Sequence, residues 1–374
     1  MPRFANMLAK GLRAQDHQVE IVSPSPRLSR LAGGAAMRKW LGYFDQYFLF
    51  PEEFRGKLKC YSASTLFVFA DHALGPWVPL VANRPHVIHC HDFLAQSSAR
   101  GDVPENPLSW TGRQYQSFIR RGYSCGKHFI SVSEKTRNDL HHFLPSLPIT
   151  SEVVYNGFNQ HVPAFSVAEA RARLASKLPH DVSKGYLLHV GGNQWYKDRP
   201  GVVALYTAWR HTGAASLPLL LVGAPPDEHL ESAVSQSPFQ SSIHLLSGLT
   251  DQEVQLAYAG ATALLYPSLA EGFGWPIAEA MAAGCPVITT QEAPMTEVGA
   301  NAAFYLPRRP PGPPALAWLA AGVHLIQQVV ELSTIERERV VRAGLINASR
   351  FASETALASI ESIYKRVLLM DTNP

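Results

Sequence analysis

The sequence predicts an α/β fold in which two Rossmann-like, doubly wound parallel sheets face each other across a cleft. Short apolar runs typical of buried strands alternate with helical patterns along the whole chain, as they do in proteins with parallel sheets covered by helices. The 374 residues suffice for two domains with complete cores. The content of 46% hydrophobic and 17% charged residues is that of an ordinary globular protein.

Each half of the chain supplies its own strands. In the first half we expect strands at Val19–Val22, Leu66–Ala70, His86–Cys90, His128–Val132 and Val153–Tyr155, with a helix over Glu134–Phe143. In the second half we expect strands at Tyr186–Val190, Leu219–Val222, Ile243–Leu246, Ala263–Tyr266 and Val287–Thr289. Its helices are expected at Gly201–Arg210, Asp227–Ser235, Asp251–Ala259 and Pro276–Ala283. A Ser333/Glu336 capping box begins a helix that runs to Asn347, and an amphipathic helix ends the chain.

These elements group into domains. We expect an N-terminal domain over residues 1–160, a connection over 161–184, a second domain over 185–350 and a final helix over 351–374. The polar segment Asn159–Lys184 marks the connection. The chain opens with a helical pattern, whereas a doubly wound domain normally opens with a strand. Either the biological chain starts earlier or the first strand is missing, in which case we expect a fragile N-terminal half and reduced activity.

The bulk composition excludes several classes of protein. A net charge of +3 and a pI near 8.6 give no reason to expect a nucleic-acid partner. No run of 18 apolar residues and no signal-peptide pattern is present, so we expect a cytoplasmic protein. The four cysteines form no Cys-x-x-Cys pair, which predicts buried thiols and no disulfide frame or zinc site.

Residues 266–290 carry the most informative pattern, which is a strand end, a glycine loop, a short helix and the next strand. Glu271 stands in the loop and Glu279 stands in the helix. Pro276 suits the first helical position, and Gly284 suits the position that ends the helix. The glycines at 272 and 274 allow close approach of a ligand to a helix N-terminus, which attracts anions. Two carboxylates beside an anion site suit a ligand that carries both hydroxyls and phosphates.

This string resembles the Glu-x7-Glu signature of retaining glycosyltransferases of the GT-B fold, in particular family 4. The resemblance implies that Glu279 accepts hydrogen bonds from the two ribose hydroxyls of a nucleotide-diphosphate sugar. It implies that Glu271 contacts the transferred sugar, and that backbone groups at Gly272, Phe273 and Gly274 lie near sugar hydroxyls. The sugar nucleotide is a co-substrate, and no cofactor is expected.

A second loop, from His189 to Arg199, follows a strand and leads into a helix. The family resemblance assigns it to the donor phosphates through Gly191, Gly192, Lys197 and Arg199. Lys197 matches the family's lysine. Gly192 stands where relatives have a basic residue, which leaves one phosphate contact open, and Arg199 is either its replacement or a solvated charge at a helix start.

The first domain offers His91 and Asp92 at a strand end, where the family has a similar His-Asp pair facing the donor or acceptor. Asp71 and His72 end the preceding strand and are further acceptor-side candidates. His89 and His91 share one face of their strand, but no third ligand is evident nearby, so we expect no metal. The chain also contains no Asp-x-Asp triplet.

These observations predict a retaining, metal-independent hexosyltransferase that moves a sugar from a nucleotide-diphosphate sugar to a growing glycan or a lipid-linked acceptor in polysaccharide biosynthesis. A catalytically weak or inactive nucleotide-sugar-binding protein is the main alternative, and a phosphorylase or epimerase on the same fold is another. The aromatic stretch Lys39–Pro51, with Arg55, Lys57 and Lys59 nearby, has two interpretations. It contacts an acceptor sugar or the inner face of the membrane, or it is a buried helix with aromatic core contacts.

Overall fold

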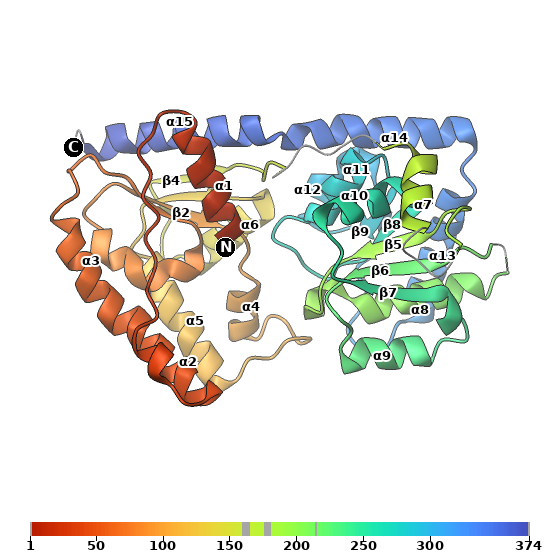
Figure 1. Cartoon of the computed structure of the whole chain (residues 1–374), viewed down its shortest axis with the longest axis horizontal. Helices are drawn as coiled ribbons and strands as arrows, with labels where there is room; N and C mark the ends of the chain where they lie inside the picture. The colour runs from red at the N-terminus through yellow and green to blue at the C-terminus, as the bar shows by residue number, and fades with distance from the viewer. Residues whose placement is uncertain (1, 159–164, 176–180, 214, 373–374) are drawn as a thin grey trace. The chain divides into compact units, whose positions relative to one another are not determined.

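The computed structural model describes residues 2–158, 165–175, 181–213 and 215–372, which divide into two compact units. The first unit comprises Met1–Val103, Pro107–Gly157 and Ser353–Pro374, and the second comprises Pro104–Asn106 and Phe158–Ala352. Each unit holds one parallel β-sheet with helices packed on it (Figure 1). The predicted class, α/β with two parallel sheets, is confirmed.

The first unit has a sheet with the strand order β1-β2-β3-β4, in which every described pair is parallel. Its strands are β1 (Phe67–Phe69), β2 (His86–Cys90), β3 (His128–Ser131) and β4 (Thr150–Val153). Its α-helices are α1 (Pro2–Arg13), α2 (Ala35–Phe44), α3 (Phe50–Leu58), α4 (Leu94–Arg100), α5 (Trp110–Tyr123), α6 (Glu134–Phe143) and α15 (Ser353–Thr372). Three further helical segments complete it, namely the 3₁₀ helix η1 (Leu28–Leu31), the π-helix η2 (Asp45–Leu49) and the 3₁₀ helix η3 (His72–Val81).

Alternate residues of the strands in the first unit face two different helical layers, because successive side chains of a strand point to opposite faces. Ile88 and Phe129 pack in one cluster with residues of α3, η3, α5 and α6. Val87 and Ile130 pack in the other cluster with α1 and with Ile360, Ile363, Tyr364 and Val367 of α15. The predicted amphipathic helix at the end of the chain is therefore confirmed, and its apolar face covers this sheet.

Two predicted strands of the first unit differ from the structure, because the strand expected at Val153–Tyr155 is β4 at Thr150–Val153 and the one expected at Val19–Val22 is absent. Residues 19–22 are described and form no strand, because they pair with no strand of the sheet. Their alternation has another explanation, since Val19 packs against the α1–α15 cluster and Val22 against the opposite cluster. The segment therefore passes between two apolar layers. Its sequence alternates like that of a strand, although its backbone forms no hydrogen-bonded ladder with the sheet.

The second unit has a sheet with the strand order β10-β9-β8-β5-β6-β7, again parallel throughout its described pairs. Its strands are β5 (Leu187–Val190), β6 (Leu219–Gly223), β7 (Ile243–Ser247), β8 (Ala263–Tyr266), β9 (Val287–Thr290) and β10 (Phe304–Leu306). Its α-helices are α7 (Val167–Ala175), α8 (Arg199–Arg210), α9 (Glu228–Ser235), α10 (Asp251–Gly260), α11 (Trp275–Ala282), α12 (Met295–Gly299), α13 (Leu316–Val330) and α14 (Thr334–Ala348). The 3₁₀ segments are η4 (Trp195–Lys197), η5 (Gln240–Ser242), η6 (Ala300–Ala302) and η7 (Ser349–Phe351).

The strand order of the second unit reverses between β5 and β8. From β5 the chain winds outward through β6 and β7, and it then returns to the other side of β5 to add β8, β9 and β10. In open α/β sheets, ligands bind in the crevice at the carboxyl ends of the strands where the order reverses. The loops that follow β5 and β8 therefore lie where a ligand is expected.

Local signals fix the helix ends of this unit. Thr250 and Glu253 form a capping box at α10, and Ser333 and Glu336 form the predicted one at α14. Such reciprocal caps satisfy donors that a helix start leaves free. The core on one face of the sheet is formed by α8, α9 and α13, with Trp209 fully buried.

The four cysteines differ in exposure. Cys90 and Cys285 are buried as predicted, but Cys60 and Cys125 are exposed, which corrects the expectation that all four thiols are buried.

Among the described residues no single helix is both long and apolar enough to cross a bilayer. One bent pair of helices, Leu316–Val330 with Thr334–Asp371, reaches the required length and apolar composition.

Candidate functional site

The loops after β5 and β8 bring Lys197 and Glu271 together. Lys197 Nζ lies 2.8 Å from Glu271 Oε1, and the two side chains are only 14% and 8% exposed. The Tyr266 hydroxyl accepts a hydrogen bond from Lys197 Nζ and donates one to Glu271 Oε1, each at 2.5 Å. Ser268 Oγ donates to the same carboxylate oxygen at 2.6 Å. An ammonium group and a carboxylate are thus held side by side by two hydroxyls in a largely buried network.

Backbone contacts hold these two loops against each other. The Leu269 N–H donates to the Tyr196 carbonyl at 2.7 Å, and the Ser268 hydroxyl, whose one proton is shared with Glu271, lies 2.8 Å from the same oxygen. On the other side, Thr290 Oγ1 donates to the Ser268 carbonyl at 2.7 Å, which anchors the loop to β9. The position of Glu271 relative to Lys197 is therefore set by the sheet and not by the two side chains alone.

The glycine loop leads directly into the N-terminus of α11. Gly274 is left-handed, with φ 102° and ψ 50°, a conformation that favours glycine. The Phe273 side chain is buried against Trp275 and Phe351, so a ligand can meet only the backbone of that residue. Pro276 lies in the first turn of α11, and Gly284 has φ 75° just beyond its end. The predicted arrangement of glycine loop and helix start is therefore present, and the start of a helix attracts anions.

Glu279 lies in α11 and is half-buried. The Tyr258 hydroxyl of α10 donates to Glu279 Oε2 at 3.0 Å. Burial, together with the Glu279 carboxylate, raises the pKa of Tyr258 well above its usual value, so this tyrosine stays a donor. The two glutamates of the motif therefore share one arrangement, in which a buried tyrosine from a neighbouring element orients each carboxylate.

The loop after β5 contains a close backbone approach. The Gly191 N–H donates to the Val222 carbonyl at 2.9 Å, and a Cβ on Gly223 would lie 1.9 Å from the Gly191 carbonyl oxygen. Since Gly223 also has φ 152°, only glycine fits there. A Cβ on Gly192 would lie 2.6 Å from Oε1 of Gln194, so the Gln194 amide occupies the space beside the position where the family resemblance led us to expect a basic side chain.

Arg199 is not a solvated charge, which corrects one of the two interpretations of this residue. It is 3% exposed, and its guanidinium donates to Asn193 Oδ1 and to the Ala224 carbonyl. Arg199 therefore ties the loop after β5 to the loop after β6. The adjacent Asp198 caps α8 and accepts two hydrogen bonds from Arg309, at 2.7 and 3.0 Å.

His189 lies in β5 beneath this site and is fully buried. Its Nδ1 donates to the Leu265 carbonyl at 2.9 Å, and its ring stacks on Tyr266 with 5.9 Å between centroids. Burial lowers the pKa of His189 to about 3, so the ring is neutral at physiological pH. The neutral ring supports Tyr266 without adding a charge beside Lys197.

In the first unit, the ends of β1 and β2 bring the predicted Asp71, His72, His91 and Asp92 to one sheet edge. Asp71 caps η3 by accepting from the Ala73 N–H at 2.6 Å, and His72 Nδ1 lies 3.2 Å from its carboxylate. His91 Nε2 donates to the Ala70 carbonyl at 3.0 Å. Burial raises the pKa of Asp92 and lowers that of His91, which favours the neutral imidazole.

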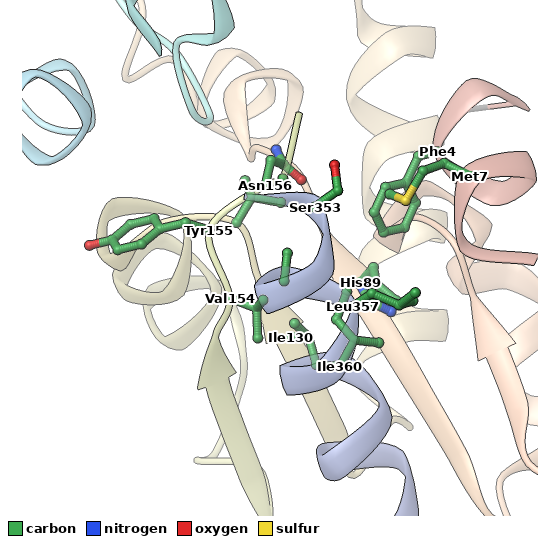
Figure 2. A pocket seen from close by; sticks show the side chains of 13 residues that line it. Phe4, Met7, His89, Ile130, Val154, Tyr155, Asn156, Ser353, Leu357 and Ile360 are labelled. Atoms are coloured by element: carbon green, nitrogen blue, oxygen red, sulfur yellow. The ribbon is translucent and has the colours of Figure 1, made fainter. Parts of the chain in front are cut away.

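A shallow, mostly apolar hollow lies beside this edge. Figure 2 shows Phe4 of α1 and Leu357 and Ile360 of α15 around His89. Phe4 contacts the rings of both His89 and His91, at 5.0 and 4.6 Å between centroids, so the two histidines share one face of β2 as predicted. His89 forms a 2.6 Å hydrogen bond with Tyr364, and within the described residues no three potential ligand side chains gather closely enough to hold a metal ion.

Comparisons with known proteins identify the family. Residues 1–161 match the model of the Glycosyltransferase Family 4 domain, and residues 184–319 match that of Glycosyl transferases group 1. The chain belongs to the family 4 glycosyltransferases.

Curated relatives match about half of the chain. The O-antigen chain mannosyltransferase B of Escherichia coli is 29% identical over 184 residues, which are 49% of this chain and 46% of that protein. The O-antigen chain mannosyltransferase RfbU of Salmonella typhimurium is 30% identical over 206 residues, which are 54% of this chain and 52% of that protein. The chain thus spans about half the length of the curated relatives it matches.

Solved structures match nearly the whole chain. Sucrose-phosphate synthase from Thermosynechococcus elongatus gives a TM-score of 0.70 at 17% identity and covers 98% of this chain and 93% of its own. Anabaena HepE, solved in complex with UDP-glucose, gives 0.65 at 19% identity and covers 96% of this chain and 88% of its own. Both comparisons show that the fold is that of GT-B glycosyltransferases.

Sequence analysis missed the residues that orient the site. Tyr266, Ser268 and Tyr258 all donate to the two motif glutamates. Tyr266 stands five residues before Glu271, at the end of a strand, and this position is the one signal that could have indicated it. Nothing near Tyr258 in the sequence links it to Glu279, because α10 and α11 meet only in the folded unit.

Proposed function

We propose that this chain is a retaining glycosyltransferase that uses a nucleotide-diphosphate sugar and needs no metal ion. The observation that carries the proposal is the network of Lys197, Tyr266 and Glu271 at the point where the strand order of the second unit reverses. It combines one cation with one oriented carboxylate at the N-terminus of α11. This combination suits a ligand that has a diphosphate at one end and sugar hydroxyls at the other.

In the proposed reaction the diphosphate leaves toward Lys197 and the N-terminus of α11. Both supply positive charge where negative charge develops, and such fixed electrostatic stabilisation of the transition state often contributes most to an enzyme's rate enhancement. Lys197 then exchanges its contact with Glu271 for a contact with the diphosphate. Glu271 is released to bind the transferred sugar, whose anomeric carbon is attacked by the acceptor hydroxyl on the face that the diphosphate leaves. The departing phosphate oxygen takes the acceptor proton, and the configuration is retained.

Glu279 is proposed to bind the ribose hydroxyls, because its carboxylate offers only acceptors and is oriented by Tyr258. His91 and Asp92 are proposed to act on the acceptor side, with Asp71 and His72 as their neighbours. His91 is neutral and hydrogen-bonded to the Ala70 carbonyl, so it can accept a proton or orient a hydroxyl.

The names of the relatives favour mannose as the transferred sugar and an O-antigen-type glycan, free or lipid-linked, as the acceptor. HepE binds UDP-glucose on the same fold, which supports a nucleotide sugar as the donor. We further propose that the protein works in the cytoplasm, because its two exposed thiols, Cys60 and Cys125, suit a reducing compartment.

The first test is a thermal-shift panel of UDP, GDP and ADP against the chain and against Glu279→Ala. A nucleotide at about 100 times its dissociation constant stabilises a protein by about 2.7 kcal/mol. We expect one base to give the largest shift, and we expect the variant to lose it. A panel in which no nucleotide shifts the chain would contradict the donor site.

The stereochemical outcome is tested separately with the matching sugar nucleotide and a synthetic lipid-linked acceptor. NMR of the product should show the anomeric configuration of the donor, with unchanged rates in a chelator. An inverted product would refute the proposed mechanism, and nucleotide binding without transfer to any acceptor would favour a non-catalytic binding protein.

A further inference from the structure

The helical arm formed by α2, η2 and α3 exposes an unusual row of large apolar side chains. Met37, Trp40, Phe44 and Phe48 are 58%, 73%, 43% and 62% exposed, and we call these four residues the aromatic ridge. They recur every three or four residues, which places them on one side of the arm. In Figure 1 this arm runs along one edge of the first unit. Contiguous apolar surface of this kind marks an interaction site on a soluble domain.

The opposite side of the arm is firmly packed, so the exposure of the ridge does not come from a loose helix. The Asp45 carboxylate accepts hydrogen bonds from the N–H groups of Arg27, Leu28 and Ser29 and from Ser29 Oγ. The hydroxyls of Tyr47 and Tyr115 lie 2.7 Å apart. Phe44 and Phe48 stack on each other with 4.9 Å between ring centroids. Within the aromatic stretch Lys39–Pro51, only Asp45 and Phe50 are buried, so the alternative of a wholly buried helix is wrong.

The surface next to the ridge is cationic. Residues 21–44 contain four basic residues, Arg27, Arg30, Arg38 and Lys39, and no acidic residue. All four are exposed. Arg27 pairs with Glu53, whereas the ion pairs found in the described part of the chain include none with the other three. The cations that sequence analysis placed beside the aromatic stretch are different residues. Two of them already form ion pairs, Arg55 with Glu52 and Lys57 with Glu20.

Aromatic side chains beside arginine and lysine suit the boundary between lipid headgroups and acyl chains. Tryptophan prefers this boundary, and each nearby cation is attracted to anionic headgroups. A twofold contact between two copies through the ridge would instead bring two like-charged sets of cations together. A glycan would need a hollow lined with hydrogen-bonding groups, and the ridge is a convex helix face. Charge complementarity therefore favours a membrane.

We propose that the aromatic ridge and its cations dock the first unit on an anionic lipid bilayer. Trp40, Phe44 and Phe48 enter the headgroup region, and Arg30, Arg38 and Lys39 contact the lipid phosphates. This surface lies apart from the donor-site residues in sequence and belongs to the other unit, so the inference does not depend on the proposed transferase activity.

The test is co-sedimentation of the full chain with vesicles of phosphatidylcholine alone and of phosphatidylcholine with phosphatidylglycerol in equal parts. We expect binding to the mixed vesicles, weakened by salt, and a blue shift of tryptophan fluorescence that Trp40→Phe removes. The triple variant Trp40→Ser, Phe44→Ser, Phe48→Ser should bind about tenfold or more weakly. Because the three side chains are exposed, its thermal unfolding should match that of the parent chain.

The matched control is Leu316→Ser with Ile346→Ser, which removes two equally exposed apolar side chains, 85% and 66%, from the second unit. This variant should bind vesicles like the parent. Arg38→Gln with Lys39→Gln should reduce the preference for phosphatidylglycerol while leaving the ridge in place. Equal binding by the parent and the triple variant would overturn the proposal. So would a change from dimer to monomer in the triple variant with no effect of lipid, which would make the ridge a contact between copies.

Discussion

The Tyr266 hydroxyl is the group whose removal tests the site most directly. It is the bridge between Lys197 Nζ and Glu271 Oε1, and both of its hydrogen bonds go to charged partners. Tyr266→Phe deletes this bridge and leaves the ring, its buried packing and the direct contact of 2.8 Å between Lys197 and Glu271. The variant therefore changes how the two charges are held without removing either of them.

The expected loss follows from the number and kind of these bonds. A hydrogen bond to a charged group contributes about 1.5–3 kcal/mol. Ser268 Oγ still holds Glu271 in the variant, so we expect the equivalent of one such bond to be lost from the transition state. A loss of about 1.5–3 kcal/mol corresponds to a fall in kcat of about 10- to 150-fold. The donor KM should change little, because Glu279 and the backbone loops still bind the nucleotide.

Tyr258→Phe is the matched control. It removes a hydroxyl of the same kind, also fully buried, from the second glutamate of the motif. Since Glu279 is proposed to bind ribose throughout the reaction, this variant should raise the donor KM by about tenfold and leave kcat unchanged. Steady-state kinetics of the parent and both variants, with the donor varied at saturating acceptor, separate the two effects. Urea unfolding checks that the variants are folded at the assay temperature.

The proposed role of Tyr266 is refuted if Tyr266→Phe retains the parent kcat, or if both variants shift the same kinetic parameter. In the first case Lys197 and Glu271 need no bridge, and the network is only a feature of the unliganded site. In the second case the two hydroxyls affect the same step, and Glu271 and Glu279 do not have the separate roles that we propose. A rise in donor KM with Tyr266→Phe and an unchanged kcat would move Lys197 and Glu271 from catalysis to donor binding.

Two further predictions concern stability. Gly223→Ala should destabilise the chain by about 3 kcal/mol or more and weaken nucleotide binding, because its Cβ would lie 1.9 Å from the Gly191 carbonyl oxygen at φ 152°. Urea unfolding measures this, and Gly56→Ala, which meets nothing within 4 Å on α3, is the control that should cost nothing. Burial lowers the pKa of His89 to about 3, so its contribution to stability is complete above about pH 6.5 and is lost as the pH falls below that value, by about 1.4 kcal/mol per pH unit. Urea midpoints measured from pH 8 downward should show this slope, and His89→Gln, which keeps a polar partner for Tyr364, should reduce it and leave the share of His189, whose pKa is also lowered to about 3.

The strands of the second unit could be predicted well because each is a short apolar run bounded by turn residues. Ala263–Tyr266 agrees with the prediction at both ends, and the other four strands expected there agree to within one residue. The three-residue strand β10 was missed, because a strand so short, just before a proline-rich segment, gives no clear periodicity. In the first unit, the strand predicted at Val19–Val22 is absent. The alternation of polar and apolar residues there reflects packing of Val19 and Val22 on two different apolar clusters and not pairing in a sheet.

The site could be predicted only in part. The sequence identified Lys197 and Glu271 as parts of two separate loops, and the structure adds the contact between them. This contact depends on β5 and β8 being neighbours, although β6, β7 and the helices α8, α9 and α10 lie between them in the chain. Arg199 was similarly ambiguous, since the acceptors that it reaches, on Asn193 and Ala224, come from two loops that only the sheet brings together.

The described contacts also show which part of the site would have to move in the proposed reaction, in which Lys197 leaves Glu271. Lys197 and Glu271 are each fixed at the backbone, Lys197 by the 3₁₀ turn η4 and Glu271 by the loop that Ser268 and Leu269 attach to Tyr196. The flexible part is the lysine stem, whose ammonium group reaches Tyr266 and Glu271 at its far end. In the proposed reaction the two negatively charged phosphates of the donor compete with the single Glu271 carboxylate for this ammonium group. The exchange moves only the lysine side chain and leaves the backbone in place. Tyr266 and Ser268 then remain as donors to Glu271, so its carboxylate does not lose all its partners when the lysine leaves. For this reason the hydroxyls, which sequence analysis did not find, are as necessary to the proposed reaction as the two charged residues that it did find.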